Sequence, residues 1–64
     1  MKKVYLVNGM IEDFTDGTAE LEQIGNFSSY PTEFMIQGVV DRKKSKLSDN
    51  QRLLFVEIKE RIYV

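Results

Sequence analysis

Residues 2–14 read KKVYLVNGMIEDF, and this stretch decides the fold that the sequence predicts. The β-branched and aromatic run Val4–Val7 leads into Asn8-Gly9. That dipeptide favours a two-residue type I′ turn, because both central positions of the turn need a positive φ. We therefore expect an N-terminal hairpin whose second strand is Met10–Phe14, with Asp16-Gly17 as the turn that ends the unit.

The next stretch, residues 18–24, changes character towards helix. Ala19–Gln23 consists of good helix formers, and Gly25 stands where helices commonly end in a left-handed residue. The sequence therefore predicts a short helix over 18–24, with a third β-strand as the alternative. In that alternative Asp13 would lie close to Glu20, and this like-charge contact counts against it.

The central strand of the predicted sheet is residues 33–41, EFMIQGVVD. Apolar side chains occupy both parities of this stretch, which is typical of a strand buried on both faces. We expect Phe34 to be part of the core. The preceding residues 26–32 form a loop that turns at Pro31.

The C-terminal segment fits two structures. Ser48 can cap a helix, and Gln51, three residues later, completes a capping box. An apolar helical stripe follows, although residues 52–64 also alternate as a strand face. We expect the helix, near residues 48–62. The predicted fold is thus one α+β domain over residues 1–64 with a small antiparallel sheet; an all-β small barrel or meander is the alternative.

The composition of the 64 residues removes the commonest catalytic and metal-binding chemistry. The chain has no His, Cys or Trp, and so lacks the usual general base, the thiolate nucleophile and the preferred zinc ligands. We therefore expect no enzyme, no cofactor and no metal. A domain this small builds only a small core, so a partner or a second copy of the chain is a natural source of further burial.

No apolar stretch is long enough to direct the chain to a membrane. The run Val4–Val7 is far shorter than a secretory or membrane-spanning segment, which predicts a cytoplasmic protein with no membrane partner. The net charge of −1 conceals an asymmetry: residues 1–40 carry two cations against six anions, and residues 41–64 carry seven cations against four anions. The two halves either orient a partner or neutralise each other in the fold.

Two charged groups are candidate sites. The acidic group, Glu12, Asp13 and Asp16, lacks the alternating ligands of a calcium loop, so it is either a solvated turn or a candidate contact for a partner protein. The basic group is placed on a loop directly after the predicted central strand, where it could neutralise phosphates. It consists of Arg42, Lys43, Lys44 and Lys46. Against nucleic acid stands the sequence pI of about 5.3, whereas nucleic-acid-binding domains are usually markedly basic.

A third candidate is aromatic. Phe27 and Tyr30 flank the turn at Pro31, and large amphipathic side chains around a rigid turn are typical of interface hot spots. The sequence therefore favours a small, non-enzymatic protein-interaction module that binds a partner protein or itself, and inhibits or adapts that partner. A nucleic-acid-binding accessory protein that uses residues 42–46 is the alternative.

Overall fold

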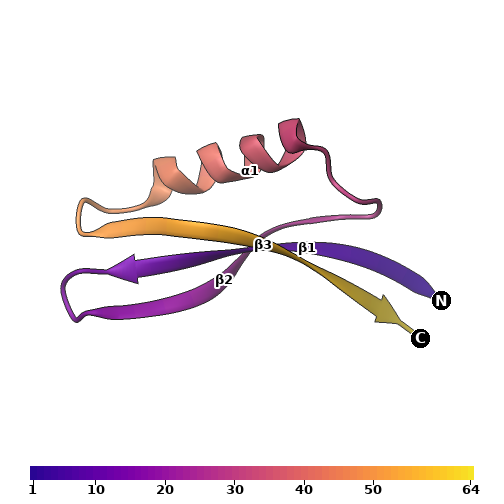
Figure 1. Ribbon diagram of the computed structural model, residues 1–64, viewed down its shortest axis with the longest axis horizontal. Coiled ribbons are helices and arrows are strands. Elements are labelled where there is room, and N and C mark those ends of the chain that lie inside the picture. Colours follow the sequence, from indigo (N-terminus) through magenta and orange to yellow (C-terminus); the bar gives the residue numbers. More distant parts are fainter.

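The computed structural model describes all residues, 1–64, as a three-stranded antiparallel sheet and one helix (Figure 1). The elements follow the order β1 (Lys2–Asp13), β2 (Thr18–Phe27), α1 (Glu33–Lys46) and β3 (Gln51–Tyr63). The strand order is β2-β1-β3, so β1 is the central strand and the connection through α1 crosses over it. The predicted α+β class is confirmed, but most of the predicted elements within it are wrong.

The expected turn at Asn8-Gly9 does not exist, because β1 runs straight through it and Met10–Asp13 continues the same strand. Gly9 instead makes room for its neighbours: a Cβ there would lie 2.7 Å from Leu53 Cδ1 and 3.3 Å from Ile24 Cδ1. The hairpin turn lies at residues 14–17, where Gly17 has a φ of 72° and its N–H donates to the Asp13 carbonyl at 2.9 Å. The turn expected at Asp16-Gly17 is therefore confirmed.

Residues 18–24 belong to strand β2 and not to a helix, so this prediction is wrong. Pairing with β1 overrides the helix propensity of Ala19–Gln23, since it satisfies the backbone along the whole stretch. The expected clash is avoided as well, because Asp13 pairs with Thr18 while Glu20 pairs with Ile11.

Residues 33–41, predicted as the central strand, form most of helix α1. Thr32 caps the helix, with its Oγ1 accepting the Met35 N–H at 3.2 Å. Glu33 lies in the first turn and three lysines lie in the last turn, as the helix dipole favours. In the helix, Ile36, Val39 and Val40 lie on one face. The same residues would point to both faces of a strand, which is why the sequence suggested a buried strand.

The predicted helix near 48–62 is also wrong, and the alternative strand is the structure that forms. The capping contact itself exists: the Ser48 N–H donates to Gln51 Oε1 at 3.2 Å. It closes a turn, in which the Gln51 N–H returns to the Ser48 carbonyl at 3.1 Å, and β3 begins directly afterwards. The local signal was therefore real, but pairing with β1 makes the residues after the turn a strand.

The core is small and lies where α1 crosses the sheet. Its buried apolar side chains are Val7, Ile11 and Val39, whereas the buried Leu6 lies on the opposite face of β1. Gly25 lets the helix approach β2, because a Cβ there would lie 3.0 Å from Val39 Cγ1. The 14-residue helix is about 21 Å long, whereas the 12-residue strand β1 spans about 40 Å, so α1 covers only part of the sheet.

The molecule is elongated and exposes much surface for its size. Its extents are 42 × 24 × 14 Å and its radius of gyration is 12.9 Å, against about 11 Å for a compact chain of this length. Its accessible surface is 4761 Å², whereas a compact monomer of the same mass exposes roughly 4,200 Å². No helix has the length and apolar character needed to cross a membrane.

Candidate functional site

Aromatic side chains gather at the end of the sheet where β2 leads into α1. Tyr5 and Phe27 are cross-strand partners on the side of the sheet that α1 covers. Tyr30 packs edge-on against Tyr5, with ring centroids 5.4 Å apart and an interplanar angle of 75°. Phe34 follows in the first turn of α1, on the outside of the helix, and is grouped with the other rings by its place after Pro31 and not by a ring contact. We call these four residues the aromatic site: Tyr5, Phe27, Tyr30 and Phe34.

The outer two members of the aromatic site are exposed but are held by ordered neighbours. Tyr30 is 65 % exposed and Phe34 is 88 % exposed, whereas Pro31 between them is buried. The buried proline and the Thr32 cap fix the start of α1, so both rings are attached to well-defined backbone. The expectation that Phe34 lies in the core is wrong, because on the helix it points away from the sheet while Val39 points towards it.

The acidic candidates are engaged in the hairpin at the other end of the sheet. Glu12 forms an ion pair with Arg52 at 2.9 Å, and Asp13 accepts the Thr15 N–H at 2.8 Å. Asp16 accepts from the hydroxyl and the N–H of Thr18, at 2.7 and 3.0 Å. Both hydrogen bonds stabilise the charged carboxylate and so lower the pKa of Asp16. The bond from the Thr18 hydroxyl contributes more than the bond from the Thr18 N–H.

The structure does not bring the acidic and aromatic candidates together. Asp13 and Tyr5 are eight residues apart along β1, a distance of about 26 Å on an extended strand. No group of three or more carboxylates lies close enough to hold a metal ion. A single partner contact that includes both groups would have to extend over most of the molecule.

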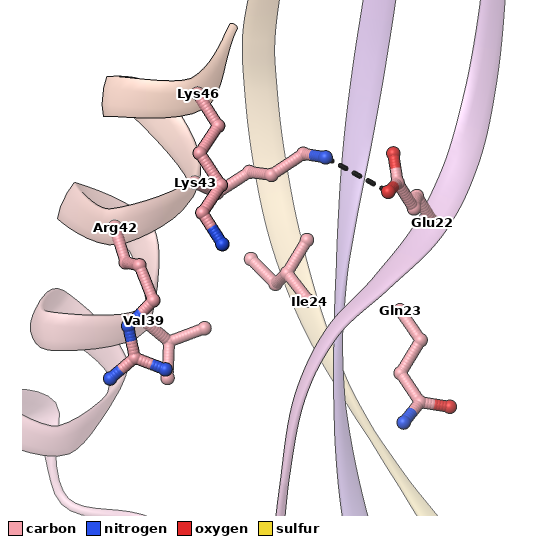
Figure 2. A pocket seen from close by; sticks show the side chains of 7 residues that line it. All are labelled: Glu22, Gln23, Ile24, Val39, Arg42, Lys43 and Lys46. Carbon is pink, nitrogen blue, oxygen red and sulfur yellow. Dashed lines mark hydrogen bonds and ion pairs between the residues drawn. The ribbon is translucent and has the colours of Figure 1, made fainter.

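The basic candidates lie in the last turns of α1 and not on a loop, which corrects the prediction. Three of them, Arg42, Lys43 and Lys46, border a hollow of about 180 Å³ between α1 and β2 (Figure 2). Lys43 Nζ reaches across it to Glu22 Oε1 on β2 at 2.8 Å. Lys44 lies on another side of the helix, beside β3. The four cations therefore form no single patch, and one of them is already paired.

The ion pairs also bear on the charge asymmetry. Glu22 with Lys43 and Glu12 with Arg52 each join an anion from residues 1–40 to a cation from residues 41–64. Lys3 pairs with Glu60 at 3.2 Å in the opposite sense, and this pair raises the pKa of Lys3. Part of the asymmetry is thus neutralised within the fold.

Comparison of the chain with protein-family models, with curated proteins and with solved structures finds no match. The functional proposal therefore rests on the site itself. Sequence reasoning included Phe27 and Tyr30 but missed the exposure of Phe34. The signal was present in Pro31-Thr32-Glu33, a proline and a capping residue followed by an acid, which is typical of a helix start.

Proposed function

We propose that this protein is a small, non-enzymatic protein-interaction module that docks a partner protein through the aromatic site. The observation that carries the proposal is the exposure of Tyr30 and Phe34 on either side of the buried Pro31, at the capped start of α1. Large rings that are held in place before binding lose little conformational entropy on docking, and they bury much apolar area in a pocket of the partner. The partner is therefore expected to present an apolar pocket that takes one or both rings.

The surroundings of the site support binding more than chemistry. Tyr30 packs on the Tyr5 ring beside the buried Pro31, and the Thr32 hydroxyl between Tyr30 and Phe34 is used in the helix cap, where it accepts the Met35 N–H. Docking there can mask or adapt a surface of the partner without any covalent step.

Nucleic-acid binding is the second candidate. It is favoured by Arg42 and Lys46, which line one hollow and form no ion pair. Against it, the same hollow contains the carboxylate of Glu22, which would repel a phosphate. Cations in the last helical turns also stabilise the helix dipole, which accounts for them without a ligand.

The test is affinity capture from the source lysate with the tagged chain, after nuclease treatment, using matched variants. Tyr30→Ala and Phe34→Ala each remove an exposed ring and are expected to reduce the captured partner about tenfold or more, as a hot-spot truncation does. Phe14→Ala is the control, since Phe14 is also an exposed ring but lies in the hairpin turn at the other end of the molecule.

The outcomes separate the two candidates. Equal capture by all three variants would refute the aromatic site as the docking surface. Recovery of nucleic acid without nuclease, lost early in a salt gradient and weakened by Arg42→Ala or Lys46→Ala, would replace protein docking by the second candidate.

A further inference from the structure

Strand β3 is an edge of the sheet with an unpaired backbone. Two hydrogen bonds near the turn between β1 and β2 show which backbone groups of β1 point towards β3 and which point towards β2. The Phe14 N–H donates to the Asn50 carbonyl, beside β3, whereas the Asp13 carbonyl accepts from the Gly17 N–H, beside β2. Since the direction alternates along an antiparallel strand, even-numbered residues of β1 bond towards β3. Their partners from Phe55 to Tyr63 are odd-numbered, so the N–H and C=O groups of the even-numbered residues of β3 point outwards. These residues are Val56, Ile58, Glu60 and Ile62.

The edge is long and exposes apolar side chains near both of its ends, with the charged residues Glu57, Lys59, Glu60 and Arg61 between them. Strand β3 has 13 residues, and the main backbone contacts of α1 are with β2 and not with β3. Leu54, Phe55, Ile62 and Tyr63 are each between 42 % and 51 % exposed. A long, uncovered edge with exposed apolar side chains is a template for pairing with another strand. The excess surface of the molecule agrees with a missing neighbour.

The sequence of β3 is complementary to itself in one antiparallel register. With Ile58 opposite Ile58 of a second copy, each Glu57 faces a Lys59, and each Phe55 faces an Arg61. A register centred on Glu57 would place two carboxylates opposite each other, and one centred on Lys59 would place two ammonium groups opposite each other. In the register centred on Ile58, residues of β3 whose N–H and C=O groups point outwards lie opposite the same kind of residue in the second copy. The backbone hydrogen bonds between the two strands can therefore form.

A groove beside the edge fits the same register. The groove lies between α1 and β3, has a volume of about 180 Å³, and is lined mainly by apolar side chains. Its lining residues are Val40, Lys44, Leu53, Leu54, Phe55 and Val56. In the register centred on Ile58, Glu60 of the second copy lies opposite Val56, on the side of Lys44, and Ile62 of the second copy lies beyond it, towards the bulge at Leu54 and this groove.

We propose that a second copy of this chain pairs along β3, antiparallel and with Ile58 at the twofold axis, to form a continuous six-stranded sheet. The axis is perpendicular to the sheet, so both helices and both aromatic sites lie on the same side. The dimer would present two docking sites, which allows bivalent binding. The dimer stands on the β3 edge alone and does not depend on the proposed docking through Tyr30 and Phe34.

The experiment is a charge-reversal cycle, read by sedimentation equilibrium over a micromolar to millimolar range. The wild-type chain is expected to approach twice the 7.5 kDa of one chain as its concentration rises. Glu57→Lys and Lys59→Glu each create two like-charge pairs and are expected to weaken the dimer about tenfold or more. The double variant restores both pairs and is expected to restore the dimer.

Mixing the two single variants is the sharpest arm. A Glu57→Lys chain and a Lys59→Glu chain complement each other at both positions, so the mixture is expected to dimerise when neither variant does alone. Glu20→Lys on β2 is the control, because it makes the same change on the other edge and leaves the register of β3 unchanged. Circular dichroism of each variant verifies that the monomer is folded.

Every outcome decides the proposal. A wild-type chain that stays monomeric throughout the range would overturn it and would leave the edge to a strand of another protein. A dimer that Glu57→Lys and Lys59→Glu leave unchanged would overturn the register and place the interface elsewhere. A variant that no longer dimerises but still captures the partner protein, or one that dimerises but no longer captures it, would show that the β3 interface and the aromatic site act independently.

Discussion

The two edge strands of the sheet, β2 and β3, differ in the side chains that they carry and in how closely α1 covers them. Strand β2 carries the carboxylates of Glu20 and Glu22, has a bulge at Ile24, and is held against α1 by Gly25 and Lys43. Strand β3 is longer, exposes apolar side chains and has no helix packed closely along it. Charges, bulges and covering elements are the devices that keep an edge from pairing. Strand β3 also has an extra residue, Leu54, and carries five charged side chains, but these are of both signs, whereas Glu20 and Glu22 on β2 are both negative. A second copy can therefore match the charges of β3, while β2 is the edge that α1 and its like charges protect.

The largest expected effect on stability comes from disturbing the contact between α1 and β2. Gly25→Val would force a branched side chain into Val39, which a Cβ alone would already approach to 3.0 Å. Overpacking of this kind costs about 1–3 kcal/mol, so we expect thermal denaturation to show a Tm lower by roughly 5–20 °C. An unchanged Tm would mean that the helix does not rest on β2 at this point.

The matched change strengthens the helix instead. Gly38 lies in the middle of α1, and a Cβ there meets nothing within 4 Å. Gly38→Ala should therefore stabilise the chain by about 0.5–1 kcal/mol, through helix propensity alone. Urea denaturation measures this gain, and a loss of stability would show that Gly38 has a role in packing.

Strand pairing explains why the sequence predicted the class of the fold but not its elements. The turn at Gly17 was predictable because a positive φ at glycine is a local property. The Ser48–Gln51 contact was predictable for the same reason, but whether a helix or a strand comes after it depends on β1, which lies about 40 residues away in the chain. Local signals therefore located turns and caps, and long-range pairing decided the structure between them.

The candidate site was predictable in part. Tyr30 and Phe27 stood out because they flank a proline, and both belong to the aromatic site. Phe34 was assigned to the core because an apolar run looks the same in a buried strand and on a partly exposed helix. The edge of β3 was not predicted at all, since an edge is defined by the order of strands and not by the strand itself.

A smaller effect is expected from the ion pair that fastens α1 to β2. Glu22 and Lys43 are 2.8 Å apart, and the carboxylate is about half exposed, so solvent screens the pair. A double-mutant cycle with Glu22→Gln and Lys43→Met should give a coupling of about 0.2–1 kcal/mol that decreases at high salt. Coupling of zero at low salt would show that α1 is held by Val39 and its neighbours alone.

The smallest effect concerns the turn that joins β1 to β2. The pKa of Asp16 is lowered by its hydrogen bonds to Thr18, so the ionised carboxylate favours the folded chain. This contribution is present above the ordinary pKa of 3.8 and is lost as the pH falls below it. Asp16→Asn should therefore lower Tm slightly at pH 6, and the difference from wild type should shrink towards pH 3. A difference that is independent of pH would contradict this role.

Amide hydrogen exchange, measured residue by residue by NMR at two protein concentrations, tests the unequal edges most directly. If β3 pairs with a second copy, the outward N–H groups of Val56, Ile58 and Glu60 should exchange more slowly at the higher concentration, because they become hydrogen-bonded in the dimer. The outward amides of the β2 edge, such as that of Leu21, should exchange at the same rate at both concentrations. Concentration-independent exchange along β3, or protection that grows along β2 instead, would contradict the account.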